Sequence, residues 1–94
     1  MKVRVWRYDV PDEVRDEFEL EYGPTGSWAR LFAESRDFLG TELYGDLTRP
    51  GSYLTVDRFT DEPSWLAFRA QHDAAYVALG QRLAHLTSDQ EELA

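Results

Sequence analysis

The chain has 94 residues and a net charge of −8, from 18 acidic and 10 basic residues, and it contains no cysteine. This length supports one domain, residues 1–94, around one core, and 43% hydrophobic residues are too many for a disordered chain. The charge argues against nucleic acid and anionic membranes as partners, because both attract clustered basic residues. The missing cysteines exclude disulfides, thiol nucleophiles and cysteine-based metal sites. No membrane span or signal peptide is recognisable, so we expect a cytoplasmic protein.

The first half of the chain predicts one strand followed by a broken helix. Residues 3–10 are rich in β-branched and aromatic side chains and end before Pro11, which is typical of a strand. Apolar residues then follow at helical spacing, until the Gly-Pro-Thr-Gly sequence of residues 23–26 interrupts the pattern. We therefore expect two helical pieces, over residues 12–22 and 27–35.

The second half predicts a hairpin and one long helix. Residues 38–44 and 53–59 are typical of strands, and Pro50-Gly51 suits a turn between them. After a helix start signal at residues 60–63, apolar side chains recur at spacings of three or four at Trp65, Phe68, His72, Tyr76, Leu79, Leu83 and Leu86. We expect a continuous helix that could bend at Gly80, because glycine weakens a helix interior.

This order of elements predicts an α+β fold with the helices on one face of an antiparallel sheet. Alternation along the strands separates an aliphatic face, with Val3, Val5, Leu54 and Val56, from an aromatic and polar face. We predict that the aliphatic face meets the helices. The other face would then be open, with Arg4, Trp6, Tyr8, Glu42, Tyr44, Tyr53, Thr55, Asp57 and Phe59. Because so aromatic a surface usually marks an interface, we predict a homodimer in which a second copy covers it.

Five segments resemble the antibiotic-biosynthesis-monooxygenase-like family of dimeric α/β barrels. They are Val5-Trp6-Arg7-Tyr8, Tyr22-Gly23-Pro24-Thr25-Gly26-Ser27-Trp28-Ala29-Arg30-Leu31-Phe32, and residues 38–43, 53–59 and 65–72. The resemblance implies a ferredoxin-like protomer, a homodimeric barrel, and a pocket between helices and sheet. It also implies cofactor-independent oxygenation of an aromatic, quinol-like small molecule. Such a protomer ends in a fourth strand, but residues 84–94 contain no β-like run, so this strand is expected to be short, absent or replaced.

Two residues are candidates for catalysis. His72 lies in the apolar stripe of the last helix and is either a pocket base or substrate-orienting donor, or a partly buried histidine hydrogen-bonded to the neighbouring sheet. Asp57 is either a general base with a pKa raised by burial, the partner of Arg4 or Arg58 in an ion pair, or a link across the dimer. The predicted pocket residues, for which a place in the core is the alternative, are Tyr22, Trp28, Phe32, Trp65, Phe68 and Tyr76.

No metal or cofactor is expected, because the chain has only two histidines, far apart, and we place the second, His85, on the surface. Heme-degrading members of the wider superfamily bind iron through a histidine in the last helix, and that position falls near Gly80 here, so heme is the least favoured ligand. Because no catalytic constellation converges, the alternative function is a non-catalytic homodimer that binds a small hydrophobic ligand or a protein partner.

Overall fold

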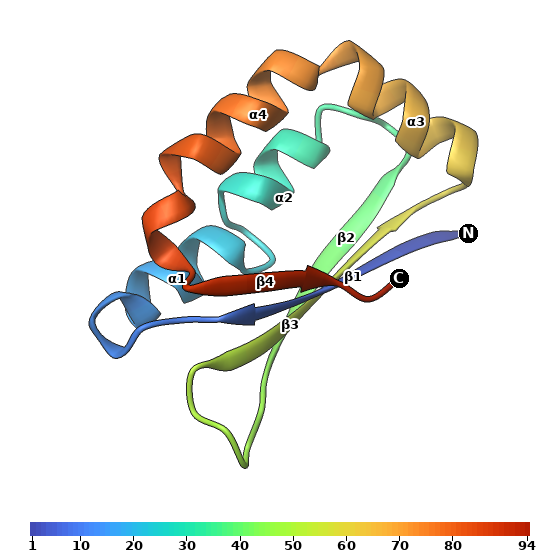
Figure 1. The fold of residues 1–94 in the computed structure, drawn as a ribbon. Coiled ribbons are helices and arrows are strands. Elements are labelled where there is room, and N and C mark those ends of the chain that lie inside the picture. The colour runs from blue at the N-terminus through green and yellow to red at the C-terminus, as the bar shows by residue number, and fades with distance from the viewer.

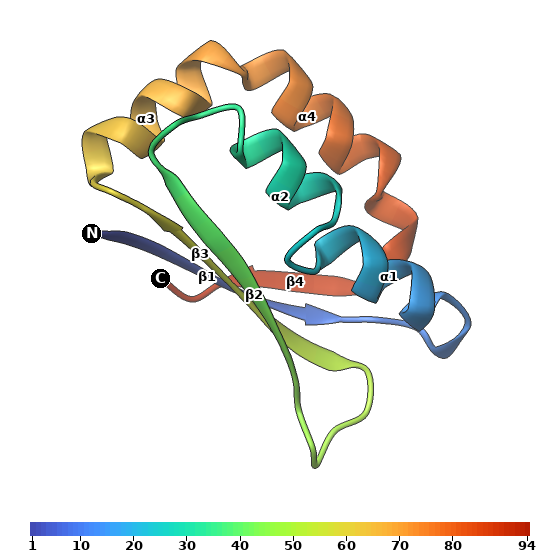
Figure 2. The same ribbon diagram turned by 180° about the vertical axis from the view of Figure 1, so that it is seen from behind.

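A computed structural model describes residues 1–94 as a four-stranded antiparallel sheet covered on one face by helices. The strands lie in the order β2-β3-β1-β4. Their bounds are Lys2–Asp9 (β1), Phe38–Gly45 (β2), Ser52–Phe59 (β3) and Asp89–Glu92 (β4). The helices are Arg15–Tyr22 (α1), Ser27–Phe32 (α2), Glu62–Gln71 (α3) and Asp73–Arg82 (α4), with 3₁₀ turns at Asp12–Val14 (η1) and Ala84–Leu86 (η2). Figures 1 and 2 show all four helices on one side of the twisted sheet. The predicted α+β, ferredoxin-like protomer is confirmed.

The break between α1 and α2 falls where the sequence predicts it. Gly26 is required there, because a Cβ atom at this position would overlap the carbonyl oxygens of Leu20 and Glu21. The second piece ends at Phe32, three residues earlier than expected. The break brings Trp28, in the first turn of α2, beside Tyr22 at the end of α1, with ring centroids 6.2 Å apart.

The last helix is broken at His72, and not at Gly80. The first part, α3, is capped by the preceding Asp61, whose carboxylate accepts a 2.8 Å hydrogen bond from the Ser64 amide. His72 leaves the helical range with φ −114° and ψ 25°, although its carbonyl still accepts a hydrogen bond from the Tyr76 amide. The bend allows α3 to lie against β3 while α4 lies against α2. Gly80 continues α4 without interruption.

The prediction of which sheet face meets the helices is wrong for β1 and β3, whereas in β2 Thr41 and Leu43 face the core as expected. The side chains buried beneath the helices from β1 and β3 are Arg4, Tyr8, Tyr53, Thr55, Asp57 and Phe59. Burying aromatic rings removes more apolar surface from water than burying valines. The two opposite charges on this face, Arg4 and Asp57, form an ion pair with each other inside the fold. In β2 a bulge between Phe38 and Gly40 directs Phe38 towards the core and leaves Leu39 53% exposed. The aliphatic face is the open one.

Two aromatic clusters form the core. The first contains Tyr8, Val10, Phe18, Tyr22, Tyr53, Leu83 and Leu86, and the second contains Phe32, Phe59, Trp65 and Phe68. Trp28 packs against both clusters. The T-shaped and stacked ring pairs within each cluster add to the apolar area that is buried.

The fourth strand exists and is short, which was one of the three expected outcomes. All four residues of β4 are exposed, and the strand pairs with β1 through registers such as Tyr8 opposite Gln90. Arg7 holds it further through ion pairs to Asp89 at 2.7 Å and Glu91 at 3.7 Å. None of the helices combines the length and apolarity that spanning a membrane requires.

Candidate functional site

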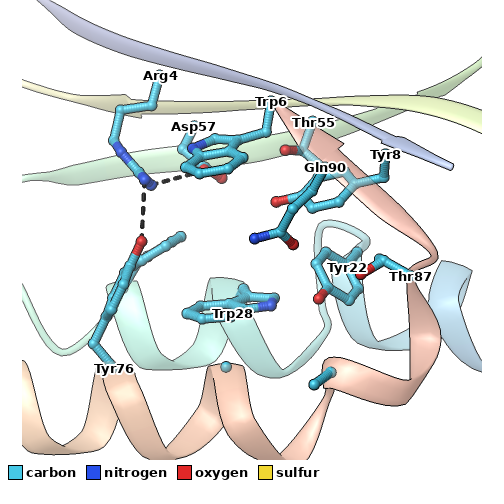
Figure 3. A pocket seen from close by; sticks show the side chains of 13 residues that line it. Arg4, Trp6, Tyr8, Tyr22, Trp28, Thr55, Asp57, Tyr76, Thr87 and Gln90 are labelled. Atoms are coloured by element: carbon cyan, nitrogen blue, oxygen red, sulfur yellow. Dashed lines mark hydrogen bonds and ion pairs between the residues drawn. The ribbon is translucent and has the colours of Figure 1, made fainter. Parts of the chain in front are cut away.

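A cavity of about 360 Å³ lies between the sheet and the helices, lined by members of both core clusters. Figure 3 shows Trp6 on the sheet side of this cavity and Trp28 on the helix side, with Gln90 of β4 between them. The lining residues are Arg4, Trp6, Tyr8, Tyr22, Trp28, Phe32, Thr55, Asp57, Tyr76, Gly80, Ala84, Thr87 and Gln90. This volume falls within the roughly 300–1,000 Å³ typical of small-molecule sites.

A buried ion pair forms one end of the cavity. Arg4 and Asp57 are directly opposite each other in the β1–β3 register, and their Nη1 and Oδ2 atoms are 3.3 Å apart. Both side chains are buried, with exposed fractions of 5% and 7%. The second Asp57 oxygen accepts a 2.6 Å hydrogen bond from Thr41, and the Arg4 guanidinium lies 4.0 Å from the centroid of the Trp65 ring.

The same guanidinium reaches across the cavity to the helices. Arg4 Nη2 donates a 3.2 Å hydrogen bond to the Tyr76 hydroxyl oxygen on α4, as Figure 3 shows. Because the Tyr76 oxygen is an acceptor in this bond, its own hydrogen is free to donate to a molecule in the cavity. The site therefore presents a phenol whose oxygen is held by a cation.

Burial raises the pKa of the Asp57 carboxyl, and the Thr41 hydrogen bond and the Arg4 charge oppose that rise without cancelling it. A carboxylate with a raised pKa is a stronger base than an ordinary surface aspartate. Asp57 thus combines a place in the cavity wall with an enhanced tendency to take up a proton.

The phenols of Tyr8 and Tyr22 also face the cavity. Burial is the main cause that raises the pKa of both hydroxyls, so both remain protonated donors at neutral pH. The neighbouring indole N–H of Trp28 opposes part of the rise at Tyr22. Nevertheless, no acceptor lies within hydrogen-bond geometry of Trp28 Nε1 or of Trp6 Nε1. Donors outnumber acceptors in this cavity, which suits a ligand that carries oxygen acceptors.

Five of the eight predicted site residues line the cavity, namely Tyr22, Trp28, Phe32, Asp57 and Tyr76. Trp65 and Phe68 do not, because they are buried in the second core cluster.

His72 also lies outside the lining. It sits at the break between α3 and α4, where its ring stacks on Phe68 and its Nδ1 faces a Glu34 oxygen at 3.4 Å. The other histidine, His85, is on the surface beside Glu17, as predicted. No three histidine, cysteine, aspartate or glutamate side chains are grouped to hold a metal ion.

Sequence reasoning missed the rest of the lining for two reasons. Alternation correctly grouped Arg4, Trp6, Tyr8 and Thr55 with Asp57, but this mixed face was assigned to the outside. A strand face that combines aromatic rings with opposite charges is what a cavity wall requires, and that signal was available. Thr87 and Gln90 come from a polar tail with no periodic pattern, so nothing in the sequence indicated them.

The fold and this cavity define a ferredoxin-like α+β protein with an aromatic, donor-rich interior site. Its fold is that of solved antibiotic biosynthesis monooxygenases. A variant of SnoaB, a cofactor-independent oxygenase from Streptomyces nogalater, superimposes with a TM-score of 0.71 at 21% identity, over 98% of this chain and 89% of that one. A protein from Nitrosomonas europaea proposed to be an antibiotic biosynthesis monooxygenase gives a TM-score of 0.68 at 9% identity, over 99% and 94% of the chains.

A third structure extends the comparison to a longer protein. A protein from Lactobacillus acidophilus proposed to be a monooxygenase gives a TM-score of 0.68 at 8% identity, and this chain spans 96% of its own length but 41% of that protein. No family model matches the sequence, and no curated protein does. The family resemblance is therefore confirmed as a likeness of fold, since identities this low carry the architecture and not the activity.

Proposed function

We propose that this protein is a cofactor-independent monooxygenase that acts on an aromatic, quinol-like small molecule bound in the cavity. The observation that carries the proposal is the combination, in one aromatic cavity, of a basic carboxylate at Asp57 and a cation-held phenol at Tyr76. The likeness of fold to a cofactor-independent oxygenase supports it.

The cavity has groups for each part of such a substrate. The indoles of Trp6 and Trp28 and the ring of Phe32 offer apolar surface for a flat ring system. The hydroxyls of Tyr22 and Tyr76 donate to its oxygen atoms.

The proposed reaction starts with a proton transfer. Asp57 accepts a proton from an acidic C–H or O–H group of the substrate, and the resulting anion is stabilised by Tyr76 and, through it, by Arg4. The electron-rich anion then reduces O₂. For a ring methylene, the carbon loses two hydrogens and gains one oxygen as a carbonyl, and the second oxygen atom leaves with those hydrogens as water. Four electrons move from the carbon to O₂, so no external reductant is needed.

An oxygen electrode tests this proposal with anthrone, whose oxidation to anthraquinone follows that stoichiometry. We expect uptake above the buffer rate, and a loss of roughly 10²–10⁴-fold in Asp57→Asn, the usual range for a general base. His72→Ala is the matched control, because His72 lies outside the cavity lining, and it should retain the wild-type rate. The proposal is refuted if no anthrone, naphthol or quinol is oxidised faster than in buffer.

One observation favours the alternative of a non-catalytic binding protein. Both oxygens of Asp57 already accept hydrogen bonds, from Thr41 and Arg4, as they would in a purely structural pair. In that case the cavity binds an aromatic ligand and leaves it unchanged. Anaerobic binding of anthrone combined with no oxygen uptake would select this function.

We also propose a homodimer, formed through the open face of the sheet and not through the aromatic face. This open face carries Val3, Val5, Val56 and the 37% exposed Leu54, beside the Arg58–Glu42 ion pair. An aliphatic sheet face left to water is an interface candidate. Light scattering should give twice the chain mass of 10.9 kDa, and Val56→Lys should halve it. A monomeric wild-type protein at micromolar concentration contradicts the proposal.

A further inference from the structure

Gly80 lies in the cavity wall at a position where folding has no need of a glycine. It is inside α4, and its φ is not positive, so the backbone does not demand it. A Cβ atom there would meet a single neighbour, Cη2 of Trp28 at 3.9 Å, which is an ordinary contact. Alanine would fit and would favour the helix.

Gly26 and Gly80 differ in the space that a side chain would find. At Gly26 a Cβ atom would overlap two carbonyl oxygens, so the chain could not fold in the same way with another residue. At Gly80 the space beyond the missing side chain belongs to the cavity. The helix therefore carries a destabilising residue whose one structural consequence is extra room beside the edge of the Trp28 ring.

We propose that Gly80 is a specificity-determining residue, which leaves room for a ligand of three fused rings and is not needed by a ligand of one ring. The inference rests on the proposed aromatic ligand, but not on its oxidation. A side chain at position 80 would project along the Trp28 edge into the cavity and shorten it. A small phenol could still bind between Tyr76 and Tyr22, whereas a long, flat molecule would collide.

The test compares Gly80→Ala and Gly80→Leu with the wild type, using phenol, 2-naphthol and anthrone as probes of increasing length. Dissociation constants are measured by calorimetry without oxygen, so that no probe is consumed. Ala78→Leu is the control, because it places the same leucine side chain at an exposed position of α4 outside the cavity lining.

We expect Gly80→Ala to raise the melting temperature and to weaken anthrone binding by about tenfold, the lower end of what one carbon causes in a hydrophobic pocket. Gly80→Leu should abolish anthrone binding, and both variants should keep the wild-type affinity for phenol. The control should leave all three affinities unchanged.

Three results would overturn the inference: anthrone binding that survives Gly80→Leu, an equal loss of all three probes in that variant, or a wild-type protein that binds none of them. A wild type that binds anthrone but consumes no oxygen would instead refute the proposed oxygenase. If Gly80 still discriminated the probes in that protein, the inference would stand.

Discussion

Replacing Arg4 by methionine should be the most informative single substitution in the molecule. Methionine keeps much of the volume and the contact with Trp65, but it removes the cation from a carboxylate that is 7% exposed. Asp57 is then left with one hydrogen bond, from Thr41. Breaking a buried pair in this way typically costs about 3–5 kcal/mol, because an uncompensated charge remains inside.

That cost is large relative to the whole stability, which for 94 residues is about 5–14 kcal/mol. It should also depend on pH. Because burial raises the pKa of Asp57, the folded state binds its proton more tightly than the unfolded state does. The contribution of this group to stability is therefore greatest below its unfolded pKa and decreases as pH rises through the raised value. Removing the Arg4 charge raises the pKa of Asp57 in the folded state further. The loss of unfolding free energy in Arg4→Met should therefore be smaller at pH 5 than at pH 7.

Urea unfolding followed by tryptophan fluorescence measures these differences at both pH values. The double variant Arg4→Met with Asp57→Leu is the decisive comparison, because it replaces both charges by apolar groups. It should recover most of the stability lost in Arg4→Met. The reasoning fails if Arg4→Met costs less than about 1 kcal/mol, as an exposed pair would, or if the two single costs simply add in the double variant.

Three further predictions concern other parts of the fold. Phe59→Ala should destabilise the domain by about 3–5 kcal/mol in urea unfolding, since Phe59 is fully buried among four aromatic rings; a loss below 1 kcal/mol would contradict that packing. Burial and the Glu19 hydrogen bond raise the pKa of Tyr53 to about 12, so stability should fall between pH 10 and 12 and absorbance titration should lose that late step in Tyr53→Phe. Arg7→Gln should speed amide exchange in β4 while leaving β3 protected, and uniform exchange in both strands would refute this role of Arg7.

The order of the helices and strands could be predicted because short runs of neighbouring residues determine each of them. Residues 23–26 break a helix wherever they occur, and the β-branched and aromatic runs of β1 and β3 favour strands. The break at His72 could not be predicted in this way, since no proline or glycine marks it. It falls where the packing partner changes, from β3 beneath α3 to α2 beside α4.

The inverted sheet faces show a more general limit of alternation. A period of two separates two sets of side chains with certainty, but it does not say which set is inside. That choice depends on pairing across the fold: Arg4 looks like a surface residue until Asp57, 53 positions later, is known to face it across the sheet. Once Arg4 and Asp57 compensate each other's charge inside the fold, the aromatic side chains contribute more buried apolar area than the aliphatic side chains would.

The same inversion moves the candidate chemistry from an interface to an interior. On an outer face, Trp6, Tyr8 and Asp57 would have been buried by a second copy and closed to small molecules. Beneath the helices they line a cavity that one chain forms, with its last wall supplied by Gln90 of the short β4. The aliphatic face is thereby released for assembly, so a dimer and an open ligand site can exist together. For this reason substitutions at Val56 should change the mass of the particle without changing anthrone affinity, whereas substitutions at Gly80 should do the reverse.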